Sequence, residues 1–231
     1  MDSNLKVPIH IGYIVDGNRR WAKSHGLPTY EGHMAGYNAI HDVAKATFEA
    51  GAEFVSAYIF STENWKRSEE EVGKLMGLVL RLLTADLPKF TKNNIRLKVL
   101  GSREGVDEKI IKAIDNAESQ TANNTAGTLA LCFNYGGQLE IADACKKIVQ
   151  SGVAADSITP ETIARNLYSP DIPPIDLVVR TSGEQRLSNF MLWRSAYSEL
   201  LFIDKSWPDM TKEDVSVIME EYNNRIRRFG K

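Results

Sequence analysis

Four groups of polar residues in this sequence each follow directly after a short apolar segment. They are Asp16-Gly17-Asn18 with Arg20 close behind, "FSTENWKR" at residues 60–67, "NYGG" at 134–137 and "RTSGEQRLSNF" at 180–190. Planar guanidinium groups match the oxygens of a phosphate, and glycines let backbone N–H groups approach the same oxygens closely. The sequence therefore predicts local binding of an anion, and a diphosphate is a better candidate than a carboxylate.

A diphosphate site of this kind suits a magnesium ion. Mg²⁺ prefers hard oxygen ligands and is usually held by one or two carboxylates together with phosphate oxygens and water. Asp16 is the first candidate ligand, and Glu199 in "AYSEL" is the candidate for a second acid. We therefore expect Mg²⁺ as a cofactor that neutralises a departing diphosphate.

Each of these features also has an explanation without function. Asp, Gly and Asn favour turns for local reasons, so residues 16–18 alone fit a simple turn. The arginine pair beside them fits a solvated surface, His33 in "EGHMAG" fits a helix cap or a polar core residue, and the four tryptophans fit packing anchors. Residues 180–190 are harder to explain in this way, because two arginines among glycine, serine and asparagine are costly to pack.

Segments typical of strands and helices alternate along the whole chain. We predict strands near residues 9–15, 53–60, 95–100, 128–133, 176–179 and 200–203, with helices before Gly51 and near 107–122, 138–150, 160–167 and 211–228. Ser68 followed by Glu71 predicts a capping box that begins another helix. This alternation predicts one α/β domain over residues 1–231, with a mostly parallel central sheet of about six strands covered by helices. Ligands of such sheets bind beyond the carboxyl ends of the strands, where the polar groups fall.

Composition excludes several classes of protein. The 231 residues carry 28 Lys and Arg against 30 Asp and Glu, a formal charge of -2 that offers no general field for nucleic acid. No apolar run approaches the roughly 20 residues of a membrane span, and the first ten residues do not read as a signal peptide. Cys132 and Cys145 lack metal-ligand spacing and are expected to be reduced core residues, which favours a cytoplasmic protein.

Five blocks of the sequence, in order, carry a resemblance to a known family. "HIGYIVDGNRRWAK", "GHMAG", "FSTENWKR", "NYGG" and "RTSGEQRLSNFMLWRSAYSEL" resemble the signature blocks of the cis-prenyltransferases, the undecaprenyl diphosphate synthase family. The resemblance runs from about residue 9 to residue 229. It implies a transferase that adds isopentenyl diphosphate to an allylic diphosphate primer, such as farnesyl or geranyl diphosphate, to give a cis-prenyl diphosphate.

The resemblance also implies roles for individual residues. Asp16 would be the key catalytic carboxylate, and the primer's diphosphate would be bound by Gly17, Asn18, Arg19, Arg20, Trp21 and His33. Around the reacting ends would lie Ser61, Thr62, Glu63, Trp65 and Arg67, with Asn64 assisting proton removal. Isopentenyl diphosphate would be bound by Arg180, Arg186, Leu187 and Ser188, and Glu199 would complete the magnesium site. The family further implies a cytoplasmic homodimer whose product can partition into a membrane and draw the enzyme to its surface.

Two positions depart from, or only weakly match, the family pattern. Thr29 stands where an arginine is common, so one contact to the primer is either missing or supplied by Arg19. Arg228-Phe229-Gly230 resembles an element that reaches the active site across a dimer in related enzymes.

Product length depends on Ile59, which precedes Ser61 by two residues on a predicted strand and should line the same face. Family members with long products tend to have a small residue there, so Ile59 favours a product shorter than the undecaprenyl carrier lipid. A long-chain synthase remains the alternative. Two remoter alternatives are a noncatalytic partner subunit of a prenyltransferase and a magnesium-dependent phosphohydrolase that uses Asp16 as nucleophile.

Overall fold

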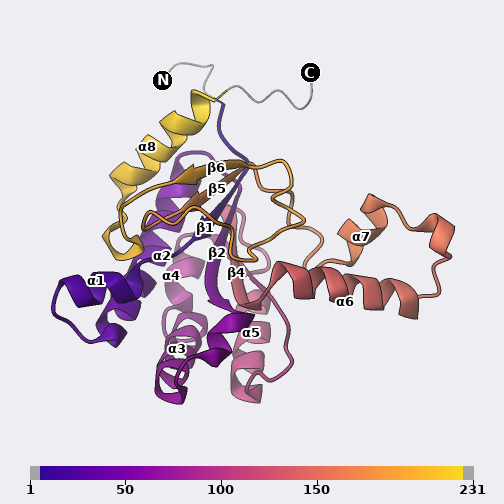
Figure 1. Cartoon of the computed structure of the whole chain (residues 1–231), viewed down its shortest axis with the longest axis horizontal. Helices are drawn as coiled ribbons and strands as arrows, with labels where there is room; N and C mark the ends of the chain where they lie inside the picture. The colour runs from indigo at the N-terminus through magenta and orange to yellow at the C-terminus, as the bar shows by residue number, and fades with distance from the viewer. Residues whose placement is uncertain (1–5, 226–231) are drawn as a thin grey trace.

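A six-stranded, fully parallel sheet forms the centre of the protein in the computed structural model, which describes residues 6–225 (Figure 1). Its strands are β1 His10–Ile14, β2 Phe54–Ser61, β3 Ile95–Leu100, β4 Gly127–Tyr135, β5 Leu177–Arg180 and β6 Glu199–Phe202. Their order across the sheet is β3-β4-β2-β1-β5-β6, so the chain crosses from one side of β1 to the other between β4 and β5. The α/β fold predicted from the sequence is confirmed.

Eight α-helices and three short 3-10 helices connect the described strands. The α-helices are α1 Asn18–Ser24, α2 Thr29–Glu49, α3 Glu69–Leu83, α4 Leu87–Lys92, α5 Glu108–Thr121, α6 Gly137–Gln150, α7 Pro160–Asn166 and α8 Lys212–Asn223. The 3-10 helices are η1 Thr62–Lys66, η2 Ala155–Ser157 and η3 Trp207–Asp209. Sequence patterns did not predict α1, η1 or α4, and the predicted extension of the last helix to residue 228 lies partly outside the described residues.

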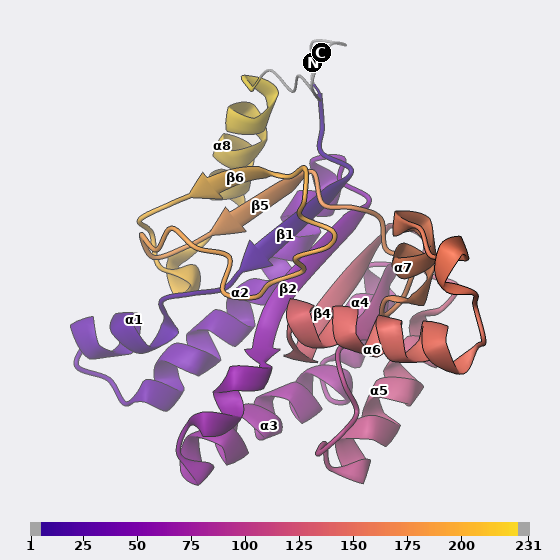
Figure 2. The ribbon, with the colours of Figure 1, turned by 45° about the vertical axis from the view of Figure 1, so that its right-hand side comes forward.

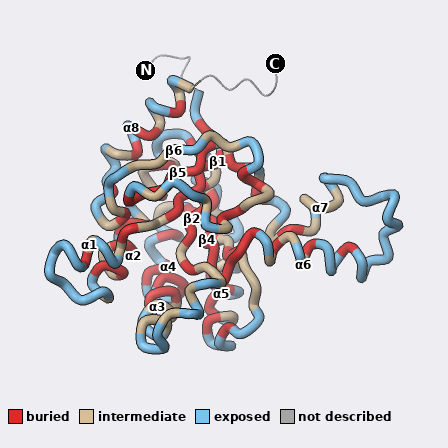
Figure 3. The backbone as a smooth tube through the Cα atoms, viewed as in Figure 1, coloured by how far each residue is buried: buried red, intermediate tan, exposed pale blue. Residues whose placement is uncertain are grey.

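The two faces of the sheet are covered differently. Ile11 and Tyr13 of β1 point into the larger core, where the sheet packs against α2, α3, α4, α5 and α8. Ile14 lies in a second core on the opposite face, together with Phe190 and Met191 of the irregular segment 181–198 between β5 and β6. Figure 3 shows the buried strands at the centre and the exposed outer end of the α6–α7 region. The segment that contains "RTSGEQRLSNF" is therefore itself a covering layer of the sheet.

A buried ion pair anchors this covering segment to α6. Arg194 Nη1 lies 2.7 Å from Glu140 Oε1, and the two side chains are 3% and 0% exposed. The remaining Arg194 donors bond the carbonyl oxygens of Ile172, Tyr168 and Ser169. The segment also lies directly on β1, because a Cβ atom on Gly12 would stand only 2.7 Å from the Phe190 ring. These contacts hold residues 190–194 against β1, α6 and residues 168–172.

The carboxyl end of β2 contains an irregularity that affects the site. Tyr58 pairs with Cys132 and Phe60 with Phe133, which leaves Ile59 as an extra residue, and the register shifts again between Phe60 and Ser61. Extra residues of this kind bend a strand and change where its side chains point. As a result Ile59 and Phe60 both contact the larger core, although simple alternation would place them on opposite faces.

Two smaller predictions are corrected by the structure. Ser68 caps α3 by accepting the Glu71 amide at 3.3 Å, but the Glu71 side chain does not return this bond and turns elsewhere. Both cysteines are free; Cys132 is buried as predicted, whereas Cys145 is exposed on α6 and is not a core residue.

Candidate active site

Residues at the carboxyl ends of β1, β2 and β5 line a cavity of about 930 Å³, together with residues of α1, α2 and α3. Figure 2 shows α1 and α3 beyond these strand ends. One end of the cavity is polar and is lined by Asp16, Gly17, Asn18, Arg19, Arg20, His33, Ser61, Glu63, Asn64, Arg67, Arg180, Glu184, Arg186, Ser188 and Asn189. The other end is lined by Tyr37, Ile40, Ile59, Leu75, Leu78, Val79 and Leu82. Five arginines against three carboxylates make the polar end suited to an anion, although the whole chain is slightly acidic.

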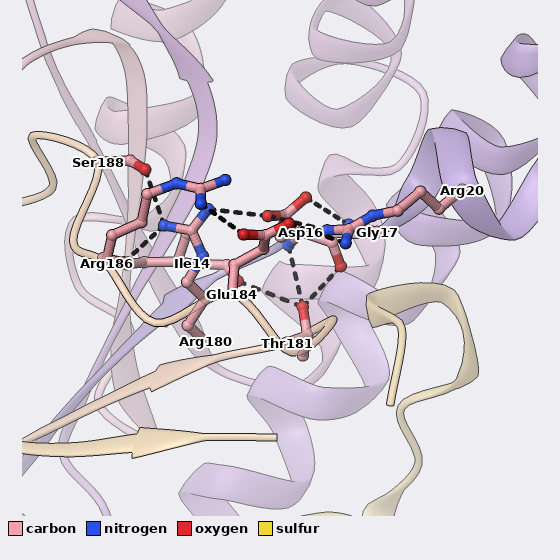
Figure 4. Close-up of polar contacts among 9 residues, drawn as sticks. All are labelled: Ile14, Asp16, Gly17, Arg20, Arg180, Thr181, Glu184, Arg186 and Ser188. Atoms are coloured by element: carbon pink, nitrogen blue, oxygen red, sulfur yellow. Dashed lines mark hydrogen bonds and ion pairs between the residues drawn. The ribbon is translucent and has the colours of Figure 1, made fainter. Parts of the chain in front are cut away.

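Asp16 lies at the centre of the polar end, just beyond β1. Its Oδ1 accepts the Gly17 amide at 2.7 Å, and its Oδ2 lies 2.8 Å from Arg180 Nη2 and 3.4 Å from Arg20 Nη2 (Figure 4). Thr181 Oγ1 donates to the Asp16 carbonyl oxygen at 2.7 Å and fixes the backbone. Burial opposes ionisation, but Arg180, the Gly17 amide and Arg20 outweigh it, so the pKa of Asp16 is lowered. Asp16 is therefore a carboxylate at neutral pH.

Arg180, the last residue of β5, and Arg186, in the segment that follows it, both line the cavity. Arg180 is only 4% exposed, and its Nη1 donates to the Arg186 carbonyl oxygen at 2.5 Å and to Ser188 Oγ at 2.7 Å. Arg186 is more exposed and pairs with Glu184, which also accepts from Arg20 at 2.9 Å (Figure 4). The buried Arg180 is thus fixed in place, whereas Arg186 has a side chain that can reorient toward a ligand.

The segment that carries Arg186, residues 181–191, has an unusual backbone. Ser182, Ser188, Asn189 and Met191 all have positive φ angles, which non-glycine residues seldom adopt. Such conformations persist only where the surrounding contacts determine them, and they concentrate at ligand sites. Here the Gly137 amide bonds the Asn189 carbonyl oxygen at 2.7 Å, so "NYGG" supports the loop.

Glycines bring the polar ends of α1 and α2 into direct contact. Gly17 precedes α1 with φ at 108°, a conformation that favours glycine. A Cβ atom on Gly32 would lie 2.0 Å from the Asn18 carbonyl oxygen, and one on Gly36 would lie 2.4 Å from Asn18 Oδ1. The glycines of "GHMAG" therefore let α2 carry His33 to the cavity beside α1.

Two buried polar atoms at the site, Asn18 Oδ1 and Arg180 Nε, have no hydrogen-bond partner among residues 6–225. Buried polar atoms are nearly always paired, and each exception calls for an explanation such as a ligand. Arg180 Nε is a donor, as an anion requires. Both residues lie in the wall of the same cavity, which is consistent with a ligand there.

Glu71 is a member of the site that sequence patterns did not identify. Its Oε1 lies 3.1 Å from His33 Nε2, 2.9 Å from Arg67 Nη1 and 4.0 Å from Arg19 Nε. Burial opposes ionisation of Glu71, but His33 and the two arginines outweigh it and lower its pKa. Burial likewise lowers the pKa of His33, so a neutral imidazole donates to Glu71 at neutral pH. The four-residue spacing between Arg67 and Glu71 was the available signal.

The 3-10 helix η1 follows β2, and Ser61, Glu63, Asn64 and Arg67 of this region line the cavity. Asn64 Oδ1 accepts the Ser61 amide at 3.0 Å, which holds the turn closed. Trp65 Nε1 donates to Asn134 Oδ1 at 2.7 Å and packs on Phe60, away from the cavity wall. Thr62 faces Gly136, where an added Cβ would meet its Oγ1 at 2.9 Å. These contacts make Trp65 and Thr62 supports of the turn within the described structure.

Trp21 and Leu187 also lie outside the described wall of the cavity. Trp21 stacks on His25 and donates to Asp209 Oδ1 at 2.7 Å. Leu187 packs against the second core. The remaining predicted substrate-binding residues all line the cavity.

Glu199 does not join Asp16 within one chain. Glu199 pairs with Leu177, and Leu177 pairs with Ile11, so Glu199 is level with the beginning of β1. Asp16 follows the end of β1, about 16 Å further along at roughly 3.3 Å per residue. Glu199 instead lies 3.2 Å from Arg225. The expectation that the two carboxylates share a metal ion is thus not met by a single chain.

The residues around Asp16 can be compared with those that usually bind a magnesium ion. Within residues 6–225 no group of three or more His, Cys, Asp or Glu side chains is arranged to hold a metal. Mg²⁺ is commonly held by one carboxylate together with substrate phosphates and water. Asp16 in this arginine-rich cavity fits that arrangement, and it does not fit a cation held by protein ligands alone. A search of the described helices found none with the length and apolarity to span a membrane.

Comparison with known proteins agrees with this geometry. Residues 14–230 match the family described as "Putative undecaprenyl diphosphate synthase". The isoprenyl transferase of Thermotoga maritima is 44% identical over 228 residues, which are 98% of each chain. Lavandulyl diphosphate synthase from Lavandula x intermedia, solved with dimethylallyl diphosphate, superimposes with a TM-score of 0.93 at 31% identity, covering 97% of this chain and 99% of that one. A "probable undecaprenyl diphosphate synthase" from Campylobacter jejuni gives a TM-score of 0.83 at 30% identity, covering 98% and 100%.

Proposed function

This chain belongs to the undecaprenyl diphosphate synthase family of prenyltransferases, and from this we infer that its cavity is the active site for the family reaction. The chain is a cis-prenyltransferase that condenses isopentenyl diphosphate with an allylic diphosphate primer. We propose that the primer's diphosphate binds at Asn18, Arg19, Arg20 and His33, and that isopentenyl diphosphate binds at Arg180, Arg186 and Ser188.

One observation carries this proposal, namely the two-part character of the cavity. Its polar end offers arginines for diphosphates, and its apolar end offers a lining of aliphatic side chains for a growing hydrocarbon tail. A phosphohydrolase would need no such apolar extension. A noncatalytic partner subunit would need neither Asp16 nor the arginines that converge on it.

The chemistry follows from where charge develops. As the allylic carbon–oxygen bond breaks, negative charge grows on the departing diphosphate, and preorganised arginines stabilise it in a site shielded from water. The allylic carbon gains cationic character, the double bond of the second substrate attacks it, and proton loss completes the new alkene. We still predict that Asn64 assists this proton loss. Asn64 lines the cavity together with Ser61 and Glu63.

We further propose that Mg²⁺ binds with the diphosphate at Asp16, where it would neutralise phosphate charge. Glu199 would reach that site only from a second copy of the chain, so its role as a metal ligand depends on the predicted homodimer. Arg228-Phe229-Gly230 lies outside the described residues, and its role across a dimer stays a prediction. Cytoplasmic location and product partitioning into membranes also stay predictions.

The decisive experiment for the function is direct. Incubation with labelled isopentenyl diphosphate, farnesyl or geranyl diphosphate and Mg²⁺ should give a chain-extended diphosphate. Release of inorganic phosphate without extension would instead support the phosphohydrolase. Chromatography of the products from each primer would also identify the preferred primer and the chain length.

Substitution of the two loop arginines should separate the two diphosphate subsites. We expect Arg180→Ala and Arg186→Ala to weaken isopentenyl diphosphate more than the primer, because Arg180 bonds the Arg186 carbonyl oxygen and Ser188, and all three residues belong to the subsite proposed for that substrate. A charge-assisted contact contributes about 1.5 to 3 kcal/mol, or roughly ten- to a hundredfold in affinity. Titration of each substrate separately measures the effect, with exposed Arg165→Ala on α7 as control. Weakening of the primer alone would mean that the subsites are reversed.

Ile59 should limit the length of the product. Its branched side chain lines the apolar end of the cavity, and a wall that is already packed absorbs added bulk poorly, at a cost of about 1 to 3 kcal/mol. We expect a wild-type product shorter than undecaprenyl diphosphate and longer products from Ile59→Ala, measured by chromatography. Val55→Ala, on the same strand but outside the described cavity wall, should leave the length unchanged. Identical products from wild type and Ile59→Ala would remove Ile59 from the tail-binding wall.

A further inference from the structure

Tyr37 crosses from α2 toward the corner between α3 and α4. It follows His33 by one helical turn, so the two side chains lie on one face of α2, and both line the cavity. The Tyr37 hydroxyl donates a hydrogen bond to Asp86 Oδ2, at the start of α4. The tyrosine ring therefore bridges two neighbouring parts of the helical layer.

The acceptor of this bond is itself held in place. The Asp86 side chain is 11% exposed and lies 2.9 Å from Lys89 Nζ and 3.4 Å from Arg81 Nε. The Arg81 guanidinium also lies 5.8 Å from the centre of the Tyr37 ring, within cation–π range. Burial, reinforced by Asp86, raises the pKa of Tyr37, so its hydroxyl keeps its proton at neutral pH. Hydroxyl and ring are thus fixed by separate contacts.

The contacts of Tyr37 with Asp86 and Arg81 lie at the apolar end of the cavity. Glu71, which contacts His33, is near the start of α3, at the polar end of the cavity, and Arg81 lies ten residues further along the same helix. At a rise of 1.5 Å per residue this separation is about 15 Å. Between these points α3 presents Leu75, Leu78 and Val79 to the cavity. A hydrocarbon tail that extends from the diphosphates along α3 would therefore meet the Tyr37 ring.

We propose that Tyr37, held by Asp86 and Arg81, is a chain-length-determining residue that closes the tail-binding part of the cavity between α2 and α3. This inference rests on the proposed function of the cavity. Ile59 belongs to the sheet and Tyr37 to the helical layer, so the two residues restrict the tail from different walls. To swing aside, the ring would have to leave a buried carboxylate without one of its donors, which is costly.

The test compares wild type with Tyr37→Ala, which removes the ring, and Tyr37→Phe, which removes only the hydrogen bond. Tyr30→Ala is the matched control, since Tyr30 is on the same helix and lies under Lys74 of α3, but is not part of the described cavity wall. Two quantities are measured: product length by chromatography, and affinity for allylic diphosphates of graded tail length by calorimetry without isopentenyl diphosphate. The affinity measurement requires no turnover, so it tests Tyr37 even if chain extension fails.

We expect longer products from Tyr37→Ala and a broader distribution that extends beyond wild type from Tyr37→Phe. Affinity for the longest diphosphates should rise about tenfold or more in Tyr37→Ala, because each additional buried methylene strengthens binding roughly fourfold. Tyr30→Ala should match wild type in both assays. Unchanged length and affinity in Tyr37→Ala, or equal shifts in Tyr30→Ala, would overturn the proposal. If Tyr37→Phe is indistinguishable from wild type, the tether to Asp86 is refuted. Absence of any extension by wild type would count against the proposed function instead.

Discussion

Replacement of Asp16 by asparagine should reduce turnover by about a hundred- to a thousandfold, the usual effect of losing a major electrostatic contact at a reacting centre. Asn keeps the size of the side chain and its bond to Gly17, but it removes the charge that pairs with Arg180 and Arg20. The protein should still fold, because Asp16 follows β1 and does not belong to the core. Single-turnover kinetics with saturating substrates measures the loss.

Asp209→Asn is the matched control for this experiment. Asp209 is also a carboxylate near α1, where it accepts the Trp21 indole at 2.7 Å, but it is outside the described cavity wall. Its substitution should leave turnover within about twofold of wild type, as expected for a group that makes no contact in the transition state. Retention of more than about a tenth of wild-type turnover by Asp16→Asn would contradict the central role of Asp16.

Arg194→Met should lower the free energy of unfolding by about 3 to 5 kcal/mol, because it leaves the fully buried Glu140 carboxyl without its arginine partner. For a protein of this size the corresponding fall in melting temperature is about 6 to 20 °C. Calorimetry or denaturant titration measures the change.

Arg96→Met provides the surface comparison. Arg96 lies 3.6 Å from Asp171 with 35% of its side chain exposed, and its loss should cost less than about 1 kcal/mol. Replacing both buried partners, as in Glu140→Leu with Arg194→Met, should be less destabilising than the two single changes added together. Strict additivity would show that the pair does not act as a unit.

Strand and helix positions were largely predictable because the chain's apolar periodicity is regular. All six strands were located: the central strands β1, β2, β4 and β5 read as short, largely apolar runs, and β3, Ile95–Leu100, alternates apolar and charged residues. The shorter helices α1, η1 and α4 were missed because their few residues give too little periodic signal and depend on tertiary contacts, such as Gly32 against Asn18. The extra residue in β2 was likewise invisible, and Ile59 reaches the cavity through that bulge, not through the simple alternation from which its position was inferred.

Some residues of the site were predictable from the sequence, and others were not. Residues at strand ends, such as Asp16 and Arg180, were located because the topology of a parallel sheet requires them to meet. Glu71 was missed because its pairing with His33 depends on how α2 and α3 pack. Glu199 was assigned by its sequence block alone, and the register of β6 against β5 then placed it at the opposite end of the sheet.

The left-handed backbone of the loop at residues 182–191 has a consequence for the thermodynamics of substrate binding. This loop is fixed by the Gly137–Asn189 bond and by the anchored segment behind it, so its conformational entropy is lost on folding and not on binding. The α1 side has two exposed arginines for the ligand to immobilise, Arg19 and Arg20, whose side chains are 61% and 52% exposed, whereas the loop side has only Arg186, at 58%. Immobilising each such side chain costs about 0.5 to 1.5 kcal/mol. Binding at the Arg180–Ser188 side should therefore have the smaller entropic penalty, and binding at the α1 side should gain more from a ligand that also fills the apolar cavity.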